Sequence, residues 1–270
     1  MKPQIQPQPE YSHLRNLDVS FGQTYGPVQS KRLGLSLGVN PLGRVKACSF
    51  DCGYCDLGPS QLTMNQIKRD VNFPPPEEIV EEVRQRLRNL RENEQNVETL
   101  TLSGNGEPTL YPHLDKLVSE LICARDELAP NSRLVILSNG AHLGSQKLIK
   151  ALNKLDERMI KLDAGSEKIF KKINSPIVRA HLSRIITGTR QLQDCIIQSI
   201  FVRGIVDNTT NEHLEEWFEA IGMIQPKQVH LYTLERVPHI SGLERVDEDF
   251  LDALAVRLRK KKHIHAKVFF

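Results

Sequence analysis

The chain has 270 residues, of which 39% are hydrophobic and 26% charged, and its formal net charge is +3. This length is compatible with one large domain, and this apolar content excludes global disorder. Residues 1–9 lack an apolar signal core, and no later stretch approaches the roughly 20 apolar residues of a membrane span. We therefore expect a cytoplasmic protein without membrane association. The modest net charge neither requires nor excludes a nucleic-acid partner.

Strand-like and helical segments alternate along most of the chain. Residues 1–30 are rich in Gln, Pro and Gly and are expected to be irregular. Beyond them, the apolar periodicity predicts strands over 32–38, 97–102, 134–137, 159–162, 196–205, 228–232 and 267–270. It predicts helices that begin at residue 77 and span 114–128, 143–155 and 250–258. One or two further helices are expected within 169–192, with a break at Pro176. Another is expected after a capping box formed by Thr209 and Glu212.

Strands that alternate with helices of this length form parallel βαβ units, so the fold class is α/β. The periodicity is compatible with an open sheet and with an incomplete barrel. In either case, the loops at the carboxyl ends of the strands are where a site is built.

Three of the five cysteines lie in one segment, Cys48-Ser49-Phe50-Asp51-Cys52-Gly53-Tyr54-Cys55. Clustered cysteines in a cytosolic chain indicate metal binding or catalysis rather than disulfides. Three soft thiolates suit an iron–sulfur cluster or zinc. Structural zinc needs a fourth ligand, and the nearest downstream histidine, His113, lies beyond a predicted helix and strand. A cubane cluster on three cysteines instead leaves one iron free for a substrate or cofactor.

The C-x3-C-x2-C spacing, with the aromatic Tyr54 before the last cysteine, resembles the signature of the radical SAM superfamily. Gly104-Asn105-Gly106-Glu107 resembles the superfamily's Gly-Gly-Glu motif, with Asn105 replacing the first glycine, and Ser138-Asn139-Gly140 resembles a position that contacts ribose or carboxylate. The resemblance covers residues 27–240 and implies the superfamily's partial (β/α)6 barrel. We expect an irregular arm over 1–26, and a C-terminal helix and possible strand over 241–270 packed on the core.

The resemblance also implies a set of site residues. A 4Fe–4S cluster would be bound by Cys48, Cys52 and Cys55, and S-adenosylmethionine (SAM) would occupy the open iron. The carboxylate of Glu107 would bind the amino group of the methionine moiety. Asp163 ends a predicted strand and points at the site, and Arg203 is able to clamp a carboxylate. The candidate cofactor-binding residues are Tyr54, Gly104, Asn105, Gly106, Glu107, Ser138, Asn139, Asp163 and Arg203.

The activity implied by the resemblance is reductive cleavage of SAM to a 5′-deoxyadenosyl radical, which abstracts hydrogen from a small-molecule or nucleotide substrate. It implies an electron donor such as a flavodoxin or ferredoxin. The segment 26–34 with Cys48 to Cys52 is similar to the branch that contains the tRNA wyosine-base synthases. Those synthases carry a second cluster, whereas only Cys123 and Cys195 remain here, and both are expected to be buried small hydrophobes.

Three alternatives stay open at this level. The same chemistry could act on tRNA, gripped by the basic stretch 257–262. That stretch is explained better as the solvated end of a terminal helix, where cations favour the helix dipole. The chain could instead place a glycyl radical on a partner enzyme. From a different class, it could be a non-catalytic iron–sulfur or zinc module, although the Gly106-Glu107-Pro108 segment has no role in that case.

Overall fold

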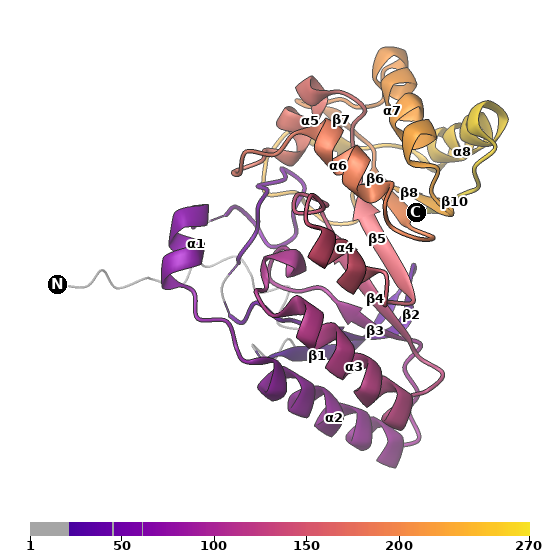
Figure 1. The fold of residues 1–270 in the computed structure, drawn as a ribbon. Coiled ribbons are helices and arrows are strands. Elements are labelled where there is room, and N and C mark those ends of the chain that lie inside the picture. Colours follow the sequence, from indigo (N-terminus) through magenta and orange to yellow (C-terminus); the bar gives the residue numbers. More distant parts are fainter. Residues whose placement is uncertain (1–21, 45, 61) are drawn as a thin grey trace.

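The computed structural model describes residues 22–44, 46–60 and 62–270. Its framework is a curled sheet of eight strands in the order β1-β2-β3-β4-β5-β6-β8-β10 (Figure 1). β1 and β2 pair antiparallel, and the other neighbours pair parallel. The strands are β1 Thr24–Ser30, β2 Gly34–Val39, β3 Thr99–Leu102, β4 Arg133–Ser138, β5 Glu157–Lys161, β6 Ile196–Ile200, β7 Val202–Gly204, β8 Gln228–Tyr232, β9 Leu243–Arg245 and β10 Ala266–Phe269. The predicted α/β class and partial barrel are confirmed.

Helices connect the parallel strands and cover the outer face of the sheet (Figure 1). They are α1 Met64–Asp70, α2 Pro76–Glu92, α3 Leu114–Leu128, α4 Gln146–Leu152, α5 Glu167–Asn174, α6 Leu182–Thr189, α7 Asn211–Ile224 and α8 Glu248–Lys262, with a short 3-10 helix at Pro108–Leu110. Each crossover helix brings the chain back to the end of the sheet where the parallel strands begin. The loops that follow these strands therefore gather at the opposite, carboxyl end. None of the helices in the described part of the chain is both long and apolar enough to cross a bilayer.

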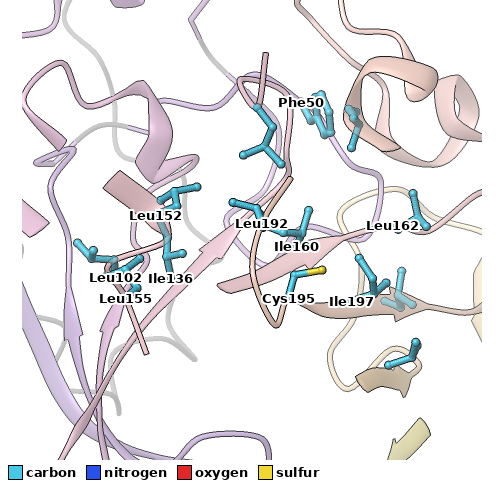
Figure 2. Close-up of a cluster of buried hydrophobic side chains, with 14 of the residues drawn as sticks. Phe50, Leu102, Ile136, Leu152, Leu155, Ile160, Leu162, Leu192, Cys195 and Ile197 are labelled. Carbon is cyan, nitrogen blue, oxygen red and sulfur yellow. The ribbon is translucent and has the colours of Figure 1, made fainter. Parts of the chain in front are cut away.

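The core lies between the helices and the outer face of the sheet. Side chains alternate across a strand, so Leu134 and Ile136 of β4 point to the helices, while Val135 points inside the curl. Figure 2 shows part of the outer layer, where Cys195 lies close to Leu192 and Ile197. Cys195 is 3% exposed and is a buried small hydrophobe as predicted, whereas Cys123 is exposed on α3, contrary to expectation.

Four local features differ from the sequence expectations. The arm expected over 1–26 lies mostly outside the described residues, and 24–30 form β1, whose alternation is hidden by Gly26 and Pro27. The segment 64–70 is helical because Thr63 and Gln66 form a capping box. The helix N-cap near residue 210 is Thr210 rather than Thr209, since the Thr210 side chain accepts from His213 N–H.

The fourth difference is the strand expected over 196–205, which is divided in two. The Asn208 side chain donates to the Ile200 carbonyl at 2.8 Å and accepts from Val202 N–H at 2.9 Å. These side-chain bonds take the place of the backbone hydrogen bonds that would continue the strand in the main sheet. The chain therefore leaves the main sheet after β6, and β7 pairs with β9 instead.

Candidate functional site

The cysteine loop follows β2 and is held by backbone hydrogen bonds on both sides. On one side, Ala47 N–H donates to the Asn105 carbonyl at 2.7 Å, and Glu107 N–H donates to the Ala47 carbonyl at 2.8 Å. On the other, Ile177 N–H donates to the Ser49 carbonyl at 3.0 Å. The loop therefore lies between the segment that follows β3 and the segment that follows α5.

The three cysteines of the loop are half-buried, and negative groups lie close to them. Burial, together with negative charge on Glu107, Cys52 and Cys55, raises the pKa of Cys48 to about 12. Burial raises the pKa of Cys52 to about 11. Cys52 and Cys55 both raise the pKa of Cys48, so the three thiols lie close enough to interact electrostatically. Without a bound metal, these raised pKa values favour the neutral thiol forms of Cys48 and Cys52.

Two asparagine amides reach these sulfurs from different elements. Asn139 Nδ2 lies 3.7 Å from Cys48 Sγ, and Asn174 Nδ2 lies 3.5 Å from Cys52 Sγ. Asn139 also donates to Ser49 Oγ at 2.9 Å. These N–H groups point at sulfur atoms, where they would stabilise thiolate charge in a bound cluster.

The turn after β3 requires glycine at position 106. Gly106 has φ of +134°, and a Cβ there would lie 1.8 Å from the carbonyl oxygen of Ala47. The adjacent Asn105 donates through Nδ2 to the Gly43 carbonyl at 2.8 Å, which ties the turn to the chain leaving β2. Gly104, the other glycine of the motif, approaches Asn40 on the same side. The motif thus allows close backbone contact between the cysteine loop and the end of β3.

Glu107 is 2% exposed, and both of its carboxylate oxygens accept hydrogen bonds from the protein itself. Oε1 accepts from Thr109 N–H at 3.0 Å, from Thr109 Oγ1 at 2.6 Å and from Ser138 Oγ at 2.8 Å. Oε2 accepts from Asn139 N–H at 2.6 Å. The side chain expected to hold a methionine amino group is therefore engaged in joining the end of β3 to the end of β4. Its position fixes Asn139, which in turn reaches Cys48.

A second buried network forms around Asp163, just beyond β5. Asp163 Oδ2 accepts from Tyr54 OH at 2.5 Å and from Asn174 Nδ2 at 2.8 Å. Its Oδ1 lies 3.0 Å from Lys161 Nζ and 2.9 Å from Ile200 N–H. Asp163 therefore joins the cysteine loop to β5, β6 and α5 at once.

Lys161 is the cation of this network. Burial lowers its pKa, but the Asp163 carboxylate and Tyr232 outweigh this and raise it above the ordinary value. Its Nζ lies 4.7 Å from the ring centroids of both Tyr54 and Tyr232. Lys161 is thus held charged between two aromatic rings beside the cysteine loop.

The structure brings together all but one of the residues predicted for the site. The exception is Arg203 on β7, whose Nη1 lies 3.8 Å from Asp247 Oδ2 and whose guanidinium lies 5.2 Å from the ring centroid of Phe250. It takes no part in the contacts described above. The reason is the division of the predicted strand after Ile200, which turns Arg203 toward α8.

Sequence reasoning missed two residues of the site, Lys161 and Asn174. The signal for Lys161 was available, because residues two apart on a strand share a face and Lys161 precedes Asp163 by two. No comparable signal marked Asn174, which ends α5 and reaches Cys52 only through the tertiary fold.

Comparison with known families identifies this arrangement. The model of the radical SAM superfamily matches residues 44–221, a range that includes the three cysteines, Glu107 and Asp163. The chain belongs to the radical SAM superfamily. Membership implies an enzyme that uses SAM and a 4Fe–4S cluster.

Relatives of this radical SAM protein include several UPF0026 proteins. It is 30% identical over 219 residues to one from Synechocystis sp., covering 80% of this chain and 76% of that protein. It is 29% identical over 255 residues to one from Helicobacter pylori, covering 90% and 78%. A protein named GTPase Obg from Brachyspira hyodysenteriae is 30% identical over 219 residues, but the match spans only 30% of that protein's length against 79% of this chain.

Solved structures of radical SAM proteins share the fold. TYW1 with a lysine-pyruvate adduct bound has a TM-score of 0.63 at 16% identity, covering 94% of this chain and 82% of that one. A radical SAM methyltransferase from Sphaerobacter thermophilus has a TM-score of 0.64 at 15% identity, covering 87% and 65%. The predicted likeness to the wyosine synthases is thus confirmed for the fold.

The donor set fits the implied cluster. Among the described residues, no three His, Cys, Asp or Glu side chains meet as ligands of a single metal ion. A cubane does not require such convergence, because each thiolate binds a different iron atom. Three neighbouring thiols on one loop, with amide donors aimed at two of the sulfurs, match that requirement.

Proposed function

We propose that this chain is a radical SAM enzyme that cleaves SAM reductively and uses the resulting 5′-deoxyadenosyl radical to abstract hydrogen from a small-molecule or nucleotide substrate. The observation that carries the proposal is the attachment of the cysteine loop to the ends of two parallel strands, through Ala47 on one side and Tyr54 on the other. Cys48, Cys52 and Cys55 would hold the cluster. A one-electron donor such as a flavodoxin or ferredoxin would supply the electron.

In this proposal, the protein's own residues orient and shield the cofactors. Asn139 and Asn174 donate to the sulfurs of Cys48 and Cys52, which lowers the energy of their thiolate forms. The turn at the end of β3, around Gly106, would lie against the methionine moiety of SAM, because glycine lets the ligand approach the backbone closely. Glu107 acts as a positioning residue for that surface rather than as a direct ligand, since its oxygens already accept four bonds.

The substrate would enter the curl of the sheet, beside Lys161 and Tyr232. A small molecule or nucleotide is favoured over tRNA, because the basic stretch of α8 is partly neutralised by α7. Arg257 and Lys261 pair with Glu215, and Lys262 lies 2.7 Å from Glu219. These pairs support the explanation of that stretch as a helix surface.

The experiment is anaerobic reconstitution of the full chain followed by iron, sulfide and product analysis. We expect about four irons and four sulfides per chain, and release of methionine and 5′-deoxyadenosine when SAM and dithionite are added. Cys52→Ala should lose the cluster, whereas the control Cys123→Ala should retain it. Iron content near that of the wild type in Cys52→Ala would reject the ligand assignment.

A further inference from the structure

A strongly basic surface lies next to the cysteine loop, on α5 and α6. Residues 167–184 contain five Lys or Arg and a single acidic residue, so this segment alone carries more positive charge than the +3 of the whole chain. All five cations are exposed. We call this surface the α5–α6 basic patch; it consists of Lys168, Lys171, Lys172, Arg179 and Arg184.

The charge of the patch is not neutralised within the described part of the chain. None of its five side chains has an ion-pair partner among the described residues. Of the two nearby acids, Asp51 pairs with Lys46 at 3.7 Å, and Glu167 accepts from Leu182 N–H at 2.6 Å. The basic stretch of α8 differs in this respect, because α7 supplies carboxylates to three of its cations.

The patch is connected directly to a proposed cluster ligand. Asn174, the last residue of α5, contacts Cys52 Sγ through its amide and lies within one helical turn of Lys171 and Lys172. Beyond it, Ile177 N–H bonds to the Ser49 carbonyl. A protein bound to the patch would thus approach the cluster by a short and partly hydrogen-bonded route. Electron tunnelling between proteins requires such closeness, because its rate falls steeply with distance.

Two residues of the patch, Lys171 and Arg179, line an open hollow of about 520 Å³ with an apolar side, and Asp51 lines it too. Its lining includes Ile177, Val178, Lys171, Arg179 and His181. Ile177 is 38% exposed. A small apolar contact beside unpaired cations suits a transient complex with an acidic protein, in which charge steers the encounter and little area is buried.

From these observations we propose that the α5–α6 basic patch is the docking surface for an acidic one-electron carrier protein that reduces the cluster. The inference rests on the proposed function, which requires one electron for each SAM cleaved. The carrier is oxidised by one electron, and the cluster accepts that electron.

The test uses the full, anaerobically reconstituted chain with an acidic flavodoxin as probe. The variant Lys171→Glu/Lys172→Glu reverses two patch charges, and the control Arg259→Glu/Lys260→Glu reverses two exposed charges on α8. Both variants change the net charge equally. Flavodoxin affinity is measured by calorimetry at low and high salt, and cluster reduction is followed by absorbance with reduced flavodoxin and with dithionite.

We expect the patch variant to weaken flavodoxin binding by ~10-fold or more at low salt, and less at high salt. The control should change it by less than about 2-fold. Reduction by flavodoxin should slow in the patch variant, while reduction by dithionite should be equal in all three proteins. Thermal unfolding checks that the variants are folded.

Two outcomes would overturn the proposal. One is equal flavodoxin affinity in the patch variant and the wild type. The other is a patch variant that loses affinity for tRNA while its flavodoxin affinity is retained, which would make the patch an RNA surface. Failure of the proposed function is distinct, because the wild type would then not cleave SAM even with dithionite, while the binding measurement would still decide the docking surface.

Discussion

The role of Glu107 as a positioning residue can be measured by replacing it with glutamine. The amide has one oxygen, which can replace Oε1 toward Thr109 and Ser138, but its NH2 group would then face Asn139 N–H. A buried N–H left without an acceptor costs about 1–3 kcal/mol. Loss of the negative charge weakens each of the other three bonds by about 1 kcal/mol. Together these losses predict that Glu107→Gln lowers the free energy of unfolding by about 4–6 kcal/mol.

The assay is urea unfolding of the metal-free chain, followed by the fluorescence of Trp217, the single and buried tryptophan. The control is Glu92→Gln, at the exposed end of α2, which should leave the unfolding curve unchanged. Glu107→Gln should also retain less iron after reconstitution, because Asn139 no longer has a fixed position beside Cys48. If Glu107→Gln and the wild type unfold at the same urea concentration with the same slope, the carboxylate does not join β3 to β4 and the reasoning fails.

Three further predictions follow from other contacts. Gly165→Ala should lower the free energy of unfolding by about 2–3 kcal/mol, because the added Cβ would lie 2.0 Å from the backbone of α7. The control Gly144→Ala, whose added Cβ has no atom within 4 Å, should leave the free energy of unfolding unchanged. Equal urea unfolding curves for the two variants would contradict this. Asp163→Asn should lower the free energy of unfolding by about 3 kcal/mol, because it leaves the buried Lys161 charge unpaired. The double variant Asp163→Asn/Lys161→Met should recover part of this loss. If the loss in the double variant equals the sum of the losses in the two single variants, the pairing is disproved. Burial and neighbouring cations lower the pKa of His230 from 6.5 to about 4, so the folded chain binds this proton less tightly than the unfolded chain. About 3 kcal/mol of the free energy of unfolding, present above pH 6.5, should therefore be lost as the pH falls to 4. A His230→Gln variant whose unfolding has the same pH dependence as the wild type would refute this.

The order of strands and helices and the position of the cysteine loop were predictable from sequence, because both depend on local patterns. The apolar run Leu134 to Leu137 identified a strand covered on both faces, and polar residues after strands identified the carboxyl edge. Asn139 and Asp163 do meet the loop, as their positions after β4 and β5 indicated, while Ser138 bonds to Glu107.

The remaining features depend on contacts between distant segments. β1 becomes a strand because β2 supplies its hydrogen-bond partners, although Gly26 and Pro27 interrupt its pattern. The sequence marks Glu107 as an acid after a strand, but whether its oxygens face a ligand or the protein depends on where β4 ends. The charge on α5 and α6 was equally visible in the sequence, yet its nearness to Cys52 arises only through Asn174.

The backbone hydrogen bonds on both sides of the cysteine loop affect how easily a lost cluster can be replaced. In a zinc finger, the metal must order the chain, so most of the binding free energy is spent on folding. Here the loop is already ordered by its bonds to Asn105, Glu107 and Ile177. The conformational entropy of bringing the thiols together is therefore lost when the barrel folds, before iron arrives. A chain stripped of its iron by oxygen keeps its ligands preorganised, and repair requires only fresh iron, sulfide and reduced thiols rather than refolding.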